Sequence, residues 1–565
     1  MEMKKILLNT VLFCMTVFTG GCSDFFEVNT DNTLNDEDYI TEESEAFTGY
    51  MGIITKLQAI GDKAIYLNEL RGELIEPTSN APRELISIYN YDTDLTGNSY
   101  ADPAGYYEVI NACNDYLSKL KAYKESYRLD ETYYKPLISG ALRIKVWTFM
   151  MIAKLYGSVI WIDKPMTSLE DLNQFEVKDL DNTMKACKSL LDSGFDGVEA
   201  SYEADWETWL DPTTAGQATS PYRQWKYMTP PAYILYAEIY LWLGEYQNCI
   251  DQIQGFLNDY RYTSSLSDYT YIRGLMLFGK YSSFWDESQD YFYREAISAI
   301  MYHDKMGGNY SISQTNHLLQ HFDNDYPNKY WLAPSEIGRA RFLDTEFAPL
   351  GGANDEDWRH DCTFKQQNGN WVIHKFKQDA SKLPYEDDVL VYMYRGADLY
   401  FMMAEAFNQL GKKEVVDALI NRGIESYVDR FNVDEDGVYS GEWEGFTPCW
   451  TDMKTYYYRE SEPKNRGYQY RDDGLRGSSG QGFYEFTDDK LQNEELILRE
   501  MMLEEACEGK VYPTMIRMAR RNKDASIMAK YVGEKYEGKG SAEAIRAKIM
   551  NGEYFIHWDL KKGTE

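Results

Sequence analysis

The chain has 565 residues and a formal net charge of −33, with 91 Asp and Glu against 58 Lys and Arg. Nucleic-acid phosphates are bound by clustered Lys and Arg, so this acidic chain is not expected to bind nucleic acid. The length allows two to four domains or one large repeat-like body. Aromatic residues make up 15% of the chain, with 48 Tyr and 13 Trp, and these side chains suit stacking on sugar rings or gripping peptides.

The N-terminus has the layout of a secretory signal. Two lysines precede an apolar run over residues 6–18, and Thr19-Gly20-Gly21-Cys22 follows. The run is shorter than the roughly 20 residues that a membrane-spanning helix needs, so a retained anchor is not expected. The last four residues resemble a lipobox, although Thr19 stands where the usual box has Leu. We expect a lipoprotein signal peptide over residues 1–21 and lipidation at Cys22; the alternative is a secreted protein with an unmodified Cys22.

Several later segments have apolar residues at helical spacing and arrive as pairs joined by a short turn. Helices are predicted over residues 106–120 and 141–156, and helix pairs around Gly244 and Gly411. The first pair resembles a tetratricopeptide unit, in which a Gly-acid-Tyr turn joins two packed helices. Its expected apolar face comprises Tyr236, Ile239, Tyr240 and Leu243 before the turn, and Tyr246, Cys249, Ile250, Ile253 and Leu257 after it. The expected face of the second pair comprises Leu399, Met402, Met403, Ala406 and Leu410, then Val415, Val416, Leu419 and Ile420.

Three long stretches lack helical period: residues 74–105, 260–395 and 425–490. They are rich in Gly, Asp, Asn and aromatic residues. Loops longer than about 15 residues are uncommon unless they are functional or disordered, and the aromatic content argues against disorder. We therefore expect a mainly α fold with few short strands, in which these excursions pack on a helical scaffold and build a binding face.

The cysteines and histidines give no sign of a metal site. Beyond the N-terminal segment the cysteines are Cys113, Cys187, Cys249, Cys362, Cys449 and Cys507. No CxxC pair occurs, so buried free thiols are favoured over zinc ligands, while disulfides stay open in an oxidising compartment. His317 and His321 would share a helix face, but Leu318 stands where a zinc protease has glutamate. No metal and no cofactor are expected.

No enzymatic constellation stands out either. Among 91 acidic residues, carboxylate pairs for glycoside hydrolysis occur by chance, and sequence gives no distance between them. The Gly-rich run over residues 474–482 lacks GxSxG spacing and a phosphate-loop lysine. We therefore expect a protein that binds and is not an enzyme.

Ordered segments along the chain resemble the SusD/RagB-like outer-membrane lipoproteins. The resemblance rests on Cys22-Ser23-Asp24-Phe25-Phe26, LNELRGELIEP from Leu67, GYYEVINACNDYL from Gly105, ALRIKVWTFMMIAKLYGSVIWIDKP over 141–165, the pair around Gly244, RGADLYFMMAEAFNQLG from Arg395, and ELILREMMLEEACEGKVYPTMIRMARR ending at Arg521. The chain departs from the family after Lys510, where Val511-Tyr512-Pro513-Thr514 replaces an aromatic and an Asp. The insertion between residues 424 and 494 is also long.

The resemblance implies a single SusD-like domain over residues 22–565, lipid-anchored on the outer face of the outer membrane. Such a protein sits as a lid on a SusC-like TonB-dependent barrel and hands it a captured oligosaccharide or, in some members, a peptide. The membrane would be touched through the lipid anchor only. The alternative outside this class is an adaptor whose helical repeats bind other proteins.

Candidate ligand-binding residues come from the excursions, because a sugar ring offers CH faces for stacking and hydroxyl rims for hydrogen bonds. The first excursion contributes Asn80, Arg83, Tyr89, Tyr91 and Asn98; the middle one contributes Trp285, Tyr330 and Trp331; the insertion contributes Trp443 and Trp450. For each of them a packing role is the competing interpretation.

Overall fold

The computed structural model describes residues 40, 43–127, 129–166, 174–213, 215, 222–259, 296–302, 321–322, 330–351, 357, 359–376, 389–423, 432–433, 439–440, 474–478 and 481–558. The predictions for Cys22, Trp285, Trp443 and Trp450 lie outside these residues.

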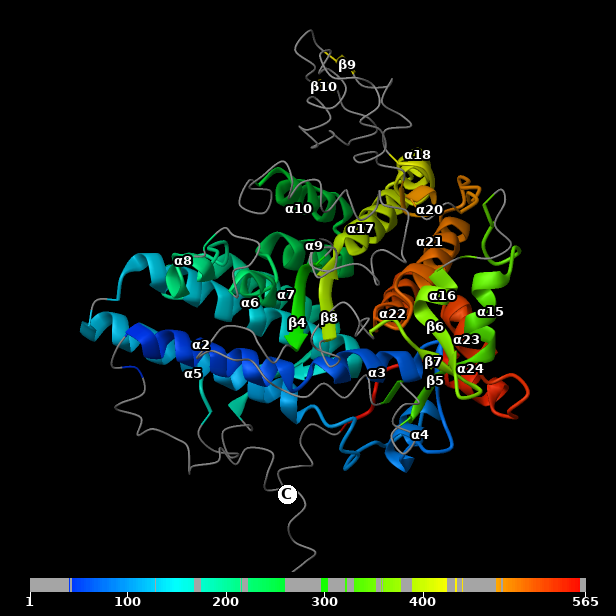
Figure 1. The fold of residues 1–565 in the computed structure, drawn as a ribbon, viewed down its shortest axis with the longest axis horizontal. Helices are drawn as coiled ribbons and strands as arrows, with labels where there is room; N and C mark the ends of the chain where they lie inside the picture. Colours follow the sequence, from blue (N-terminus) through cyan, green and yellow to red (C-terminus); the bar gives the residue numbers. More distant parts are fainter. Residues whose placement is uncertain are drawn as a thin grey trace, which may run out of the picture.

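The fold is mainly α, as predicted, and its long helices form an array in which each packs on the next in chain order (Figure 1). Nearest-neighbour packing of this kind is typical of helical repeats. The array consists of α2 (Glu43–Gln58), α5 (Ala104–Tyr127), α6 (Glu131–Tyr156), α7 (Leu180–Ser193), α9 (Ala232–Leu243), α10 (Tyr246–Asn258), α17 (Gly396–Gln409), α21 (Lys490–Glu504), α22 (Val511–Asn522), α23 (Ser526–Glu534) and α24 (Ala542–Met550).

Shorter helical segments connect and flank the array. They are α3 (Gly61–Arg71), α4 (Arg83–Tyr89), α8 (Trp206–Leu210), η4 (Arg223–Met228), α15 (Glu336–Ala340), η6 (Arg341–Leu343), α16 (Arg359–Thr363), α18 (Lys413–Asp417), the π-helical turn η7 (Ala418–Arg422) and α20 (Gly474–Ser478).

The strands of the described residues pair only in twos, always antiparallel. The pairs are β1 (Ile75–Pro77) with β5 (Leu332–Pro334), β2 (Ser158–Ile160) with β3 (Val177–Asp179), β4 (Ala296–Tyr302) with β8 (Val389–Arg395), β6 (Phe364–Gln367) with β7 (Asn370–Ile373), and β9 (Asn432–Val433) with β10 (Tyr439–Ser440). The excursions over 74–105 and 260–395 therefore carry ordered strands and short helices where they are described.

Helix α6 is the central core helix. Every residue from Pro136 to Tyr156 is buried. The Asp130 side chain caps the helix by accepting a hydrogen bond from Thr132 N at 2.8 Å, and Gly157 ends it in the left-handed conformation (φ 74°). Among the described helices, α6 alone has the length and composition to cross a membrane, and the apolar window concerned lies wholly inside the protein.

The two predicted helix pairs are confirmed as α9–α10 and as α17 followed by α18. Gly244 (φ 75°) and Gly411 (φ 76°) end the first helix of each pair in a conformation that favours glycine. The predicted buried face of α9 is wrong in part, because Tyr236 and Tyr240 are only half-buried while Ile234, Leu235 and Trp242 are buried. Helix α9 contacts α6, α7, α10 and α17, so most of its circumference is covered. The tyrosines keep their polar tips near solvent.

Four of the six predicted free cysteines are buried free thiols: Cys113, Cys187, Cys249 and Cys507. Cys362 is free but half-buried, and Cys449 lies outside the described residues. Burial raises the pKa of Cys113 to about 12, so its thiolate is scarcely populated at neutral pH.

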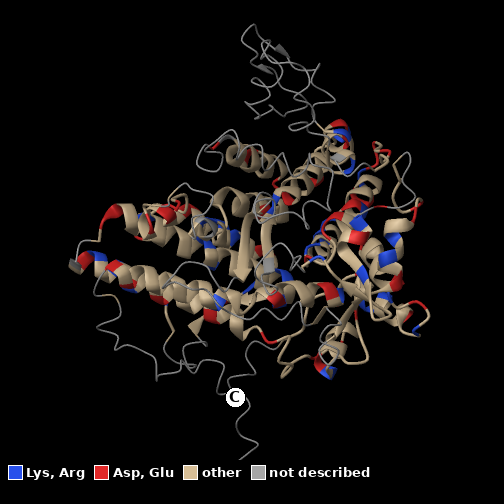
Figure 2. Cartoon of the chain, in the orientation of Figure 1, with Lys and Arg blue, Asp and Glu red and all other residues tan. Residues whose placement is uncertain are grey.

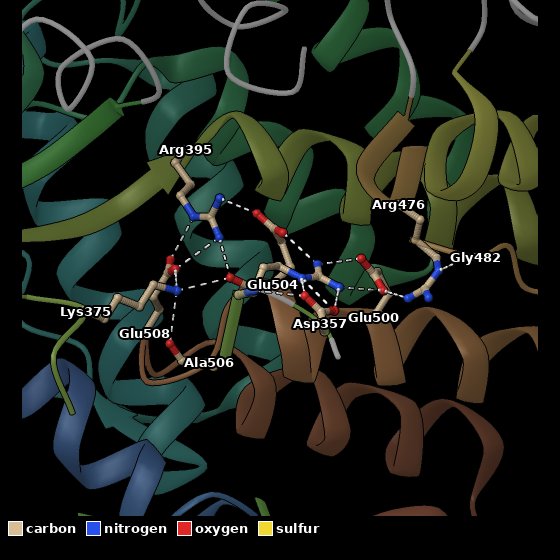
Figure 3. A network of polar contacts seen from close by, with 10 residues as sticks. Asp357, Lys375, Arg395, Arg476, Gly482, Glu500, Glu504, Ala506 and Glu508 are labelled. Carbon is tan, nitrogen blue, oxygen red and sulfur yellow. Dashed lines mark hydrogen bonds and ion pairs between the residues drawn. The ribbon is translucent and has the colours of Figure 1, made fainter. Parts of the chain in front are cut away.

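A buried ionic network ties the C-terminal helices to the rest of the chain (Figure 3). Its cations, all at most 1% exposed, are Arg359, Arg395, Arg476 and Lys375, and its carboxylates are Asp357, Glu500, Glu504 and Glu508. Figure 2 shows Lys and Arg interleaved with Asp and Glu over the helices of this region. Buried charges of this kind require partners, because an unpaired ion loses its hydration without compensation.

Arg359 is the centre of this network. Its Nη1 lies 2.7 Å from Glu500 Oε1 and 2.9 Å from Glu504 Oε2, and its Nη2 lies 2.6 Å from Asp357 Oδ2. Burial lowers the pKa of the Arg359 guanidinium, but the surrounding carboxylates raise it by more, so the net pKa lies well above the ordinary value. The side chain is therefore a permanent cation that holds α16 against α21.

The turn between α21 and α22 collects the remaining cations. Arg395 Nη1 lies 3.0 Å from Glu504 Oε1, and Arg395 Nε lies 2.9 Å from Glu508 Oε2. Lys375 Nζ donates to the carbonyl oxygens of Glu504 and Ala506 at 3.1 Å. The Glu508-Gly509-Lys510 turn is thus the place where strand β8 and residue 375 join the C-terminal helices.

Gly509 closes this turn in the left-handed region (φ 75°), and a Cβ there would lie 2.7 Å from the Ala64 carbonyl oxygen. Its N–H donates to Glu69 Oε1 at 2.7 Å. Burial raises the pKa of the Glu69 carboxyl to about 8. Both the positive φ and the close approach to α3 require glycine at this position.

Candidate functional site

The β1–β5 pair brings together segments that are far apart in sequence. Ile75 pairs with Pro334, and Pro77 pairs with Leu332. Beyond the strand, Thr78 N donates to Trp331 O at 2.8 Å, and Thr78 Oγ1 donates to Tyr330 O, 252 residues along the chain, at 2.5 Å. The structure therefore places the segment leading to Asn80 and Arg83 beside the segment of Tyr330 and Trp331.

An aromatic group, the Trp331 cluster, stands at this junction and consists of Tyr66, Tyr100, His321 and Trp331. The Trp331 ring stacks on His321 with centroids 4.5 Å apart and meets Tyr100 edge-on at 6.3 Å. His321 and Tyr66 are buried, whereas Trp331 and Tyr100 are half-buried. The buried rings thus hold the half-exposed ones in fixed orientations, which is what a stacking platform needs.

Asn98 fixes the turn that presents Tyr100. It is 7% exposed, its Nδ2 donates to Glu84 O at 2.8 Å, and its Oδ1 accepts from Tyr100 N at 3.0 Å and Ala101 N at 3.2 Å. Because both the nitrogen and the oxygen of its amide bond to the backbone, Asn98 holds the turn that carries Tyr100 in place.

Tyr89, the last residue of α4, and Tyr91, two residues after it, both contact the C-terminal part of the chain. Tyr89 is 7% exposed and its ring lies 4.5 Å from that of Tyr536. Tyr91 is 2% exposed, and its hydroxyl donates to Arg71 O and lies 3.1 Å from Tyr512 Oη. The structure does not bring these two rings into the Trp331 cluster.

Tyr330 connects the cluster to a second aromatic residue, Trp371 on β7. Tyr330 is 6% exposed and its hydroxyl donates to Trp371 O at 2.5 Å. Burial raises the pKa of Tyr330 to about 12, so the hydroxyl stays protonated as a donor. The guanidinium of Arg339 lies over the half-buried Trp371 ring, with Cζ 3.9 Å from the centroid.

Sequence reasoning missed Tyr100, Trp371 and Arg339, and it noted His321 only as half of a histidine pair. Tyr100 lies in the first excursion and Trp371 in the middle one, so both stood among the aromatic residues singled out as a class. Nothing in the local sequence of Arg339 marks it, because its partner Trp371 lies on β7, a separate element further along the chain. Within the part of the chain that the structure describes, no cluster of His, Cys, Asp and Glu could hold a metal ion.

Solved structures share this architecture over most of the chain. A SusD superfamily protein from Bacteroides vulgatus aligns with a TM-score of 0.57 at 12% identity, covering 93% of this chain and 95% of that one. NanU from Bacteroides fragilis aligns with a TM-score of 0.51 at 17% identity, covering 89% and 94%. A SusD-like carbohydrate-binding protein from Bacteroides vulgatus aligns with a TM-score of 0.51 at 13% identity, covering 85% and 83%.

No protein-family model and no curated protein sequence matches the chain. The likeness at these low identities is one of structure, and it covers 85–93% of this chain. The chain therefore has the fold of the SusD superfamily.

Proposed function

We propose that this protein is a cell-surface lipoprotein of the SusD/RagB family, anchored at Cys22, that captures an extracellular glycan and delivers it to a SusC-like TonB-dependent transporter. It binds its ligand without a covalent step. Residues 22–565 act as one domain, and a peptide ligand is the nearest alternative within the same fold. The fold supports this proposal, since one structural neighbour is described as a carbohydrate-binding protein.

The Trp331 cluster is the observation that carries the glycan proposal. Trp331 and Tyr100 present half-exposed rings over a buried support, and the exposed Asn80 and Arg83 stand on the segment paired with them. Aromatic faces beside an amide and a guanidinium match the CH faces and hydroxyl rims of a sugar ring.

Calorimetry of the Ser23–Glu565 chain against a polysaccharide panel and a peptide pool tests the ligand class. We expect a glycan to bind, and we expect Trp331→Ala to weaken that binding about 30-fold, or about 2 kcal/mol, as for a central stacking residue. Trp161→Ala is the matched control, because Trp161 is also half-buried and stacks on Phe149 at 4.2 Å, but it lies on the loop after β2.

Each outcome of this experiment is informative once thermal unfolding shows both variants to be folded. Equal loss of binding in both variants would contradict a site at Trp331. Binding of peptides alone would replace the glycan by a peptide ligand. Binding of neither, with a stable transporter complex, would favour the adaptor function, and appearance of cleaved sugar would refute the non-enzymatic role.

Anchoring and delivery need their own measurement. Metabolic labelling with an alkyne fatty acid should modify the wild-type chain and not Cys22→Ser. Affinity purification of the labelled chain from outer membranes should retain a TonB-dependent barrel. An unlabelled wild-type chain found free in the medium would refute the anchored, transporter-coupled part of the proposal.

A further inference from the structure

Arginine pairing in this acidic protein singles out two side chains. Ion pairs with carboxylates engage Arg143, Arg341, Arg359, Arg395, Arg422, Arg476, Arg499, Arg517, Arg520, Arg521 and Arg546. Arg71 donates to the carbonyl oxygens of Glu553 and Phe555. Among the arginines whose side chains the structure describes, Arg83 and Arg339 have no such partner. In a chain with 91 acidic residues, an arginine with neither a carboxylate nor a carbonyl partner is the exception.

Both exceptions flank the β1–β5 pair that carries Trp331. Arg83 is the first residue of α4, shortly after β1 ends at Pro77. Arg339 stands in α15, which follows β5 and is capped by the Ser335 hydroxyl accepting from Gly338 N at 3.1 Å. Because the strands are antiparallel, Arg83 follows the end of the ribbon that lies beside Trp331, whereas Arg339 follows the other end and lies over Trp371.

The Arg339 guanidinium is held in place without being neutralised. It lies 3.9 Å above the Trp371 ring, and the carbonyl of Trp371 is tied to Tyr330 by the hydroxyl hydrogen bond described above. Its Nε is buried with no hydrogen-bond acceptor among the described residues. Burial lowers the pKa of Arg339, and Glu336 on the same short helix opposes this only in part. A guanidinium positioned by an aromatic face and left unpaired is prepared for an acid from outside the protein.

Building on the glycan-binding function proposed above, we infer that the ligand is an anionic glycan: Trp331 stacks on a sugar ring while Arg339 pairs with a carboxylate or sulfate substituent. The planar fork of arginine suits both groups, since each offers two oxygens to parallel N–H donors. Arg83, which follows the strand end beside Trp331, supplies a second positive charge.

The test is a panel in which each oligosaccharide occurs in three forms: carboxylated, sulfated and neutral. One example is tetragalacturonate with its methyl ester, beside a galactan tetrasaccharide with and without sulfate. For the backbone that binds, we expect an acidic form to bind at least 10-fold more tightly than its neutral form. The preferred acid distinguishes a uronic-type ligand from a sulfated one.

Variants then assign the preference to Arg339. Arg339→Gln should reduce the acidic-over-neutral ratio to within about 2-fold, Arg339→Lys should keep part of it, and Arg546→Gln should leave it unchanged. Arg546 is a suitable control because it is a partly exposed arginine on α24, paired with Glu537 and Glu543. Circular-dichroism melts verify that each variant is folded.

The inference and the proposed function fail in different ways. Equal affinity for acidic and neutral forms, with binding still lost in Trp331→Ala, would overturn the anionic ligand and leave glycan capture standing. An acidic preference that survives Arg339→Gln would overturn the role of Arg339. Absence of binding to every glycan in the panel would overturn the proposed function itself.

Discussion

Replacing Arg359 by Met tests whether the buried ionic network holds the C-terminal helices in place. The substitution removes one cation from contact with three carboxylates, at distances of 2.6 to 2.9 Å, while Met fills most of the volume. Removing one member of a buried ion pair typically costs about 3–5 kcal/mol, because the remaining charge stays buried and uncompensated. Glu500 is 0% exposed and keeps only Arg476, so we expect a loss at the upper end of that range, about 5 kcal/mol.

The assay is urea unfolding followed by far-UV circular dichroism, with Arg546→Met as the matched control. Arg546 also contacts two carboxylates, but these belong to exposed residues, and exposed pairs contribute about 0–1 kcal/mol. The uncompensated carboxylates of Arg359→Met can take up protons in acid, so the difference from wild type should shrink as the pH falls from 7 towards 4. A loss below about 1 kcal/mol at pH 7, or one equal to the control, would refute the reasoning.

Three further predictions concern single groups. Burial opposes ionisation of Glu405, but Arg517 and Arg521 overcome it and lower its pKa from the ordinary 4.5 to about 2. This corresponds to about 3 kcal/mol of stability that is present above pH 4.5 and lost as the pH falls towards 2. Glu405→Gln should therefore be less stable than wild type at pH 7 and approach it in acid, and the same difference in urea midpoint at both pH values would contradict this. Gly509→Ala should destabilise the fold by about 1–3 kcal/mol more than Gly538→Ala in denaturant melts, because both glycines have positive φ but only a Cβ at Gly509 would meet a carbonyl oxygen at 2.7 Å. Equal losses of stability in the two variants would show that the backbone of the turn shifts to accommodate the methyl group. Cys113 should resist iodoacetamide at pH 8 in the native protein and react in 6 M guanidinium, as read by peptide mass spectrometry, and native labelling at the rate of an exposed thiol would contradict its burial.

Local features of the fold were predictable from the sequence because their causes are local. The helical period and the glycine turns at Gly244 and Gly411 depend on neighbouring residues alone, and both helix pairs are present. The face of α9 was predicted less well, since its burial depends on contacts with α6, α7 and α17 that no local pattern encodes.

The candidate site was predictable only as a set of segments. Aromatic content marked the excursions, but the register of Pro77 with Leu332, and hence the meeting of Trp331 with His321 and Tyr100, arises from pairing across the chain. The buried cations were unpredictable for a related reason. Arginine is ordinarily a surface residue, and Arg359 is buried because Asp357 and two acidic residues of α21 surround it.

Those acidic residues lie late in the chain, and this determines when the core can fold during synthesis. Arg359, Lys375 and Arg395 leave the ribosome long before Glu500, Glu504 and Glu508, which neutralise them. Until then, closing the core around these cations would bury unpaired charge, which is strongly unfavourable. The nascent chain therefore cannot complete its fold before α21 has been synthesised. Folding is completed by the last helices to be made.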